Sequence, residues 1–204
     1  MPVPTAHIHT KNVVAHVRRA TVGHISRENT HPFESNSWLL AHNGTIGAIE
    51  GVRPRLLETM SAGHRNEIAG DTDSELIFHY LLSLREQLAD KSLPYVVAKG
   101  LSTIDDLSQQ VDSGAELALN IILTDGRETI TVRRGRTLWT THRDAVHPCN
   151  VCGGEKHTHD GNESGYRALA VASEPVTDDE LWNEVPEGTI IHIQPDMSVT
   201  RTTL

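Results

Sequence analysis

The stretch "TDSELIFHYLLSLREQLA" (Thr72–Ala89) carries the clearest helical signal in the sequence. Its apolar residues recur at the spacing that places them on one face of an α-helix. Thr72 is predicted to be the N-cap, and Glu75 is expected to complete a capping box by reaching back to the amide of the cap. A second helix with the same periodicity is predicted over Pro94–Val111.

Strand-like segments flank these helices on both sides. On the N-terminal side we predict a buried strand at Asn12–Arg18, a hairpin whose turn is Asn43-Gly44, and a short helix over Val52–Gly63. On the C-terminal side we predict three strands within 115–142, with turns at Asp125-Gly126 and Gly135, then a strand in 167–175, a short helix or turn in 177–188, and a closing hairpin over 189–204.

This order of elements predicts an α+β fold, with helices packed on a mostly antiparallel sheet. The 204 residues suit a single domain covering 1–204, with residues 143–166 as an inserted polar Cys/His loop. The net charge of -9 and an aromatic content of 4% argue against nucleic-acid binding. The sequence shows no apolar run of membrane length and no signal-peptide pattern, so no membrane partner is expected and a cytoplasmic location is predicted.

Asn43-Gly44 has two interpretations. It is the strongest short-range signal for a type I′ hairpin turn. The amide of Asn43 and the backbone N–H of Gly44 could also converge on one oxygen and form an oxyanion hole. Taken alone, the pair favours the plain turn.

Two charged residues suggest recognition of an amino acid. Asp73 lies on the first turn of the Thr72–Ala89 helix, where its carboxylate could hold a substrate ammonium group. Arg18 lies at the end of the strand predicted over Asn12–Arg18, and arginine is the preferred bidentate partner of a carboxylate. Together with an oxyanion hole, these groups would describe a site for an amino-acid amide.

Four motifs occur in order, "AHVRRATVG", "ENTHPF", "WLLAHNG" and "GDTDSE". This set resembles the class II glutamine amidotransferases, which are N-terminal-nucleophile (Ntn) hydrolases. The C-terminal "RALAVASEPVTDDELWNEVPEG" is similar to the stand-alone branch that includes γ-glutamyl amide hydrolases. The resemblance covers almost the whole chain and implies an αββα sandwich, no required cofactor, and glutaminase-type hydrolysis of glutamine or a γ-glutamyl compound.

The resemblance also implies roles for individual residues. Arg18, assisted by Thr21, would bind the α-carboxylate of glutamine, and Asp73 would bind its α-amino group. Asn43 and Gly44 would form the oxyanion hole. The loop bordering the pocket would contain Asn29, His31 and Pro32.

The chain departs from the family pattern at the nucleophile. The family uses a cysteine at the mature N-terminus, several dozen residues before the "AHVR" motif. Here that motif begins at Ala15, no cysteine precedes it, and removal of Met1 would expose Pro2. We therefore expect an N-terminally incomplete domain that lacks the nucleophile and the first strands. A degenerate pseudoenzyme and a nucleophile from another chain are the second and third explanations.

The two cysteines lie in the inserted loop. Cys149 and Cys152 are followed by His157 and His159, a set that could hold a structural zinc ion in tetrahedral coordination. The spacing is not that of a standard zinc finger, and such loops also occur without a metal.

Two rival functions remain open. A metal-dependent amidohydrolase could use the H-x-H pair His7 and His9, although that chemistry usually sits on a (β/α)₈ barrel of about 250 residues. A chain without a nucleophile could instead be a non-catalytic subunit that binds glutamine or a γ-glutamyl compound. Expected partners are that small molecule, an ammonia-accepting enzyme, and a second copy of the chain through an exposed sheet edge.

Overall fold

The computed structural model describes residues 10–17, 26–143, 167–178 and 180–204. The chain divides into two compact units, one formed by Met1–Arg136 and Glu187–Leu204 and the other by Thr137–Pro186. Among the described residues, none of the helices has the length and apolarity needed to span a membrane.

The first unit contains a six-stranded antiparallel sheet with the strand order β1-β2-β3-β4-β8-β9. The strands are β1 (Phe33–Ser35), β2 (Trp38–Ile46), β3 (Leu117–Thr124), β4 (Thr129–Arg133), β8 (Thr189–Ile193) and β9 (Val199–Thr203). The turns predicted at Asp125-Gly126 and Gly135 follow β3 and β4, and both glycines have the positive φ that such turns favour.

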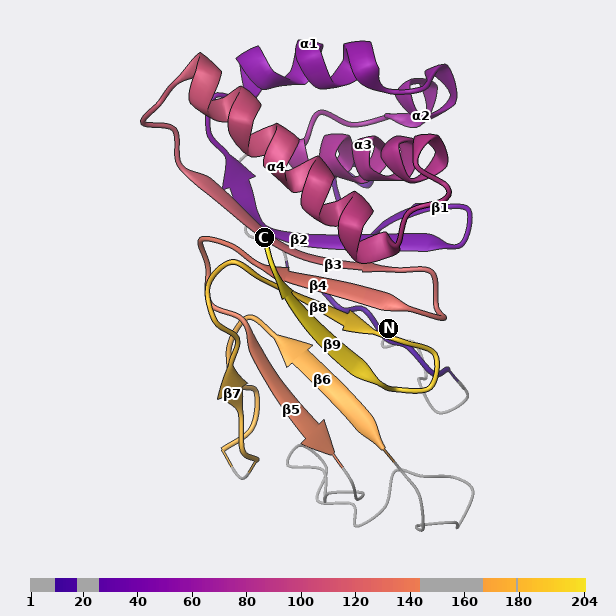
Figure 1. Ribbon diagram of the computed structural model, residues 1–204, viewed down its shortest axis with the longest axis vertical. Helices are drawn as coiled ribbons and strands as arrows, with labels where there is room; N and C mark the ends of the chain where they lie inside the picture. The colour runs from indigo at the N-terminus through magenta and orange to yellow at the C-terminus, as the bar shows by residue number, and fades with distance from the viewer. Residues whose placement is uncertain (1–9, 18–25, 144–166, 179) are drawn as a thin grey trace. The chain divides into compact units, whose positions relative to one another are not determined.

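Helices cover one face of this sheet (Figure 1). They are α1 (Ile49–Thr59), α2 (Ala62–Glu67), α3 (Asp73–Gln87) and α4 (Leu93–Val111). The core lies between the helices and the sheet, where Phe78 of α3 and Leu101 of α4 belong to one apolar cluster with Leu40 of β2 and Ile121 of β3.

The two long helices confirm the sequence prediction. Thr72 is the N-cap of α3 and accepts a hydrogen bond from the amide of Glu75 at 3.2 Å. The predicted hydrogen bond from the Thr72 amide to the Glu75 side chain is wrong. The Glu75 carboxylate accepts from the amides of Ala69 and Gly70 instead. The prediction that only one apolar face of this helix is buried is also wrong. Every residue from Asp73 to Ser83 is buried, because α3 contacts β2, α1, α2 and α4.

The N-terminal strand prediction is wrong. Residues 12–17 form no strand, and the side chains of Val13 and Val17 are 80% and 98% exposed. The alternation of this segment resembles a strand, but a strand needs a neighbouring edge to pair with. Its recorded contact with the hairpin after β3 is a side-chain hydrogen bond, from Asn12 Nδ2 to the carbonyl of Gly126 at 2.6 Å.

The second unit contains a three-stranded antiparallel sheet with the order β6-β5-β7. Its strands are β5 (Trp139–Arg143), β6 (Ala168–Ala172) and β7 (Asn183–Glu184). The 177–188 segment, predicted as a short helix or turn, contains the short strand β7 within its described part. The predicted α+β class with antiparallel sheets is confirmed.

Candidate active site

Asn43 and Gly44 lie inside strand β2, so the predicted hairpin turn is wrong. Asn43 pairs with Asn120 and Gly44 with Leu119, in a ladder that runs unbroken to Ile46. The chain leaves the strand only after this point, where Gly47 donates to the carbonyl of Glu116 and Ala48 adopts a left-handed conformation. The runs on either side of Asn43-Gly44 are therefore one strand.

Gly44 is required by a close approach within the sheet. A Cβ atom at this position would lie 1.9 Å from the carbonyl oxygen of Ala118 and 2.7 Å from Nε2 of His42. His42 Nε2 and the Ala118 oxygen are themselves 3.0 Å apart. The contact between His42 and Ala118 thus occupies the space that any side chain at position 44 would need.

A buried polar chain joins β2 to the first turn of α3. Because the carbonyl of Ala118 can only accept, His42 Nε2 carries the proton and Nδ1 accepts from the hydroxyl of Ser74 at 2.9 Å. Burial lowers the pKa of His42, although the Asp73 carboxylate and the Ala118 carbonyl oppose this shift. His42 is therefore a neutral imidazole at neutral pH.

Asp73 is positioned at the same junction. Its side chain is buried, and its Oδ2 accepts from the backbone N–H of Ile46 at 3.0 Å. Its Oδ1 lies 3.3 Å from the hydroxyl of Ser74. An ionised carboxylate offers about four acceptor positions, so these two contacts leave capacity for a further donor.

The register of β2 tells which way its backbone amides point. The amide of Gly47 bonds to Glu116 on the β3 side, so by antiparallel alternation the amides of Gly44 and Ile46 point to the opposite edge. Strand β1 pairs along that edge only as far as Leu40. The N–H of Gly44 therefore points to the edge at which Asp73 binds the N–H of Ile46.

The side chain of Asn43 is on the other face of β2. His42, Gly44 and Ile46 share the face toward α3, whereas the exposed Asn43 lies on the face away from it. The structure thus places Gly44 near Asp73, while the side chain of Asn43 projects away from the helix layer.

The loop before β1 is held by side-chain contacts that the sequence did not reveal. Asn29 and Asp71 form a reciprocal pair, with Asn29 Nδ2 donating to Asp71 at 2.7 Å and the Asp71 amide donating back at 3.1 Å. The ring of His31 stacks on His16 at 4.2 Å between centroids and meets Phe33 edge-on at 4.7 Å. These contacts tie both segment 10–17 and the start of α3 to the loop.

An open depression of about 560 Å³ lies beside this loop. Most residues between Arg27 and Asn36 line it, including the predicted loop residue Pro32 but not Asn29 or His31, and the rest of its wall comes from Glu67, Ala69, Glu75 and His79. Three predicted site residues that the structure describes, Asn43, Gly44 and Asp73, do not line this depression.

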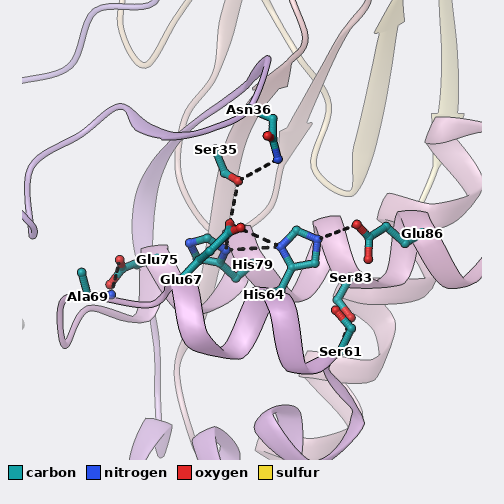
Figure 2. Close-up of polar contacts among 10 residues, drawn as sticks. All are labelled: Ser35, Asn36, Ser61, His64, Glu67, Ala69, Glu75, His79, Ser83 and Glu86. Carbon is teal, nitrogen blue, oxygen red and sulfur yellow. Dashed lines mark hydrogen bonds and ion pairs between the residues drawn. The ribbon is translucent and has the colours of Figure 1, made fainter.

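Three residues that sequence reasoning missed gather between α2 and α3. His64 and Glu67 of α2 lie with His79 of α3 so that one potential ligand atom from each falls within 4.8 Å of the others (Figure 2). Burial lowers the pKa of His79, opposed by the charges of Glu67 and Glu75. The sequence signal was weak, because His79 is 15 residues from His64.

The other predicted ligands cannot be placed. Arg18 and Thr21, predicted to bind the α-carboxylate, lie outside the described residues. So does the predicted zinc set, Cys149, Cys152, His157 and His159. His7 and His9, the pair that the rival amidohydrolase hypothesis would use, also lie outside the described residues.

Comparison with known proteins identifies the family. The sequence model of the class II glutamine amidotransferase family matches residues 3–203 of this chain. A Saccharomyces cerevisiae protein named as a probable glutamine amidotransferase is 29% identical, over 89% of this chain and 57% of its own length. The γ-glutamyl-hercynylcysteine sulfoxide hydrolase of Mycolicibacterium smegmatis is 24% identical, over 92% of this chain and 62% of its own.

A solved structure has a similar fold. The structure of a glutamine aminotransferase class-II domain protein from Silicibacter pomeroyi superposes with a TM-score of 0.65 at 22% identity, covering 88% of this chain and 72% of that one. The chain spans somewhat over half of the length of the two curated relatives. Because the sequence model of the family matches nearly all of its residues, the chain belongs to the class II glutamine amidotransferases.

Proposed function

We propose that this chain binds glutamine or a γ-glutamyl compound and takes part in hydrolysis of its side-chain amide. Membership of the class II amidotransferase family supports the reaction class. The mycobacterial relative, named as a hydrolase of a γ-glutamyl compound, supports γ-glutamyl amides as the wider substrate class.

The observation that carries this proposal is the edge of β2 beside the first turn of α3. There the Asp73 carboxylate binds the N–H of Ile46, and the N–H of Gly44 points to the same edge two residues earlier. Asp73 would bind the α-amino group of the substrate through its remaining acceptor positions. The N–H of Gly44 would stabilise the oxyanion that forms from the substrate carbonyl. The part of the Asn43 amide in this oxyanion hole rests on the resemblance alone, because its side chain lies on the face of β2 away from α3.

The remaining recognition roles rest on the resemblance alone. Arg18, with Thr21, would hold the α-carboxylate, because a guanidinium matches a carboxylate in a bidentate geometry. His31 would border the pocket. Its stacking on His16 supports this role, since His16 lies two residues before Arg18 and ties that segment to the loop.

The reaction needs a thiolate. In the family mechanism the sulfur attacks the carboxamide carbon, the C–N bond breaks, and ammonia leaves with a proton carried by the α-amine of the nucleophile. Water then hydrolyses the thioester and regenerates the thiol. Cys149 and Cys152 are the only cysteines in this sequence. We propose that the thiolate comes from a cysteine outside it, in the same protein or in a partner, and that ammonia passes to an accepting enzyme.

Ligand binding to the present chain tests the recognition half of the proposal. Isothermal titration calorimetry should detect glutamine or a γ-glutamyl amide, and Arg18→Ala and Asp73→Asn should each weaken binding by at least about tenfold, the loss expected for a charge-assisted hydrogen bond. Asp73→Asn is chosen because the amide oxygen can still accept from Ile46. Arg127→Ala, at an exposed hairpin position, is the control that should bind normally.

Unchanged affinity in both Arg18→Ala and Asp73→Asn would overturn the site assignment. The catalytic half requires the native protein from its source, whose intact mass and N-terminal sequence would show whether it contains an additional cysteine. Ammonia release by that protein supports the enzyme. Tight glutamine binding without ammonia release would instead identify a binding subunit.

A further inference from the structure

His64, Glu67 and His79 converge at a second place on α3, away from the β2 edge. His64 and Glu67 are three residues apart on α2, and His79 faces them from α3 (Figure 2). The Nδ1 atoms of the two histidines are 3.5 Å apart. Oε2 of Glu67 lies 3.6 Å from Nδ1 of His79 and 3.8 Å from Nδ1 of His64.

These spacings do not suit hydrogen bonds. An N–H···O bond spans about 2.7–3.2 Å, so the carboxylate oxygen is too far from either ring nitrogen. The 3.5 Å between the two nitrogens is at the outer limit for a hydrogen bond. Two histidines and an acid that formed a simple hydrogen-bonded network would be expected to pack closer than this.

The same spacings suit three ligands around one ion. Sides of 3.5, 3.6 and 3.8 Å make a nearly equilateral triangle. The point equidistant from its corners lies in their plane, about 2.1 Å from each atom, which is the length of Zn–N and Zn–O bonds. Tetrahedral ligands at that bond length are about 3.4 Å apart, so the three atoms need to approach one another by only a few tenths of an ångström to bind Zn²⁺.

Neighbouring side chains hold two of these ligands in place. Nε2 of His64 lies 3.2 Å from Oε1 of Glu86, and a proton donated to that carboxylate leaves Nδ1 as the coordinating nitrogen. The hydroxyl of Ser35 donates to Oε2 of Glu67 at 2.8 Å. Metal ligands in proteins commonly have such outer hydrogen-bonding partners, which fix the ring tautomer and the orientation of the carboxylate.

We propose that His64, Glu67 and His79 form a binding site for a divalent transition-metal ion, Zn²⁺ in the first place. The ligand atoms are Nδ1 of both histidines and Oε2 of Glu67. Two imidazoles and one carboxylate are ligands that Zn²⁺ takes readily, and three protein ligands leave a fourth position open. None of these ligands comes from the Cys149/Cys152 loop, and the site does not depend on the proposed amide chemistry.

The open position has an identifiable outlet. Glu67 and His79 line the depression beside the loop before β1, and the Glu67 side chain is 47% exposed, so solvent reaches the ligand triangle from that side. The fourth ligand is therefore water or an oxygen atom of a small molecule that enters the depression. Carboxylates are the class of small molecule that we expect, because Zn²⁺ binds carboxylate oxygens.

The test uses the full chain without an affinity tag, carrying Cys149→Ser and Cys152→Ser so that no thiolate can bind metal. After treatment with EDTA and dialysis, the protein is titrated with Zn²⁺ against a chelating dye, and separately with Co²⁺. The expected result is one equivalent of Zn²⁺, with the visible Co²⁺ absorption of a four-coordinate N/O site. If the cysteine substitutions prevent folding, Co²⁺ spectra of the unsubstituted chain still separate the sites, because only thiolates give sulfur charge-transfer bands.

Variants assign the ligands. Glu67→Gln changes a half-exposed side chain and should leave the fold intact, yet lower Zn²⁺ affinity by at least about 100-fold, since even outer partners contribute about 10–100-fold. His79→Ala should do the same, and His142→Ala, which removes an exposed histidine elsewhere, should not. Should His79→Ala fail to fold, Glu67→Gln decides. Parent-like affinity in Glu67→Gln, or no Zn²⁺ bound by the parent, would overturn the site.

Discussion

Two of the polar junctions between helix α3 and its neighbours are built differently. At its first turn, Asp73 and Ser74 contact β2 with separations of 2.9–3.3 Å. Just over one turn later, His79 faces His64 and Glu67 of α2 at 3.5–3.8 Å. The first junction is made at hydrogen-bond distances, whereas the three ligand atoms of the second are farther apart.

The difference predicts opposite tolerances to substitution. Buried groups that are paired at hydrogen-bond distance are costly to remove, because the partner is left unsatisfied. At the α2 junction the half-exposed Glu67 accepts one such bond, from Ser35, so in the absence of metal stability should depend less on Glu67 than on Asp73. Unfolding free energies of variants at the first junction and metal affinities of variants at the second would therefore test whether the two junctions differ in this way.

The largest effect is expected at Gly44. A methyl group there would collide with the Ala118 carbonyl and with the His42 ring, so Gly44→Ala should lower the free energy of unfolding by about 3 kcal/mol, as strong overpacking does. Urea denaturation measures this change. Gly63→Ala is the matched control. Its Cβ would meet nothing within 4 Å, and Ala is preferred in a helix, so it should be neutral or slightly stabilising.

Asp73 should have the next largest effect. Asp73→Ala removes the acceptor of the Ile46 N–H and should destabilise the protein by about 2 kcal/mol, the range for hydrogen bonds to charged groups. Glu67→Ala, measured in EDTA, removes only the acceptor of the Ser35 hydroxyl and should destabilise the protein by about 1 kcal/mol, less than Asp73→Ala. Equal losses in the two variants would contradict the distinction between the junctions.

A tenfold effect on metal affinity is expected from an outer residue of the second junction. Glu86→Gln weakens the partner of His64 Nε2 and should lower Zn²⁺ affinity by about tenfold, while leaving stability in EDTA unchanged. The same dye competition measures it. A change in stability without a change in affinity would mean that Glu86 only supports the packing of α2.

Sequence reasoning succeeded where a signal was local. The apolar period gave α3 and α4 nearly to the residue, and Thr72 was correctly predicted as the N-cap. The Asn43-Gly44 turn failed because the same dipeptide also suits a strand whose neighbour approaches too closely for a Cβ. The strand predicted over residues 12–17 is absent because an alternating apolar pattern cannot show whether a neighbouring strand is available for pairing.

The candidate sites divide in the same way. Motif order was enough to predict the family, and it drew attention to Asp73 and Gly44, which the structure places near one edge of β2. The structural role of Asp73 in binding the Ile46 amide was not foreseen, because it depends on where β2 passes in space. His64 and His79 come from different helices, and no sequence spacing shows that their rings face each other.

The smallest effect expected is on the pH dependence of stability. The pKa of His42 is lowered in the folded protein by burial, so below about pH 6.5 the unfolded chain binds this proton more readily than the folded one. The contribution of His42 to stability is therefore complete above pH 6.5 and is lost as the pH falls, by at most about 1.4 kcal/mol per pH unit for one proton. His42→Gln, whose amide can still donate to Ala118 but does not titrate, should reduce this slope between pH 7 and pH 5 when urea denaturation is followed in EDTA. An unchanged slope would show that the acid sensitivity arises at other groups, and that protonation does not disturb the hydrogen-bonded junction between β2 and α3.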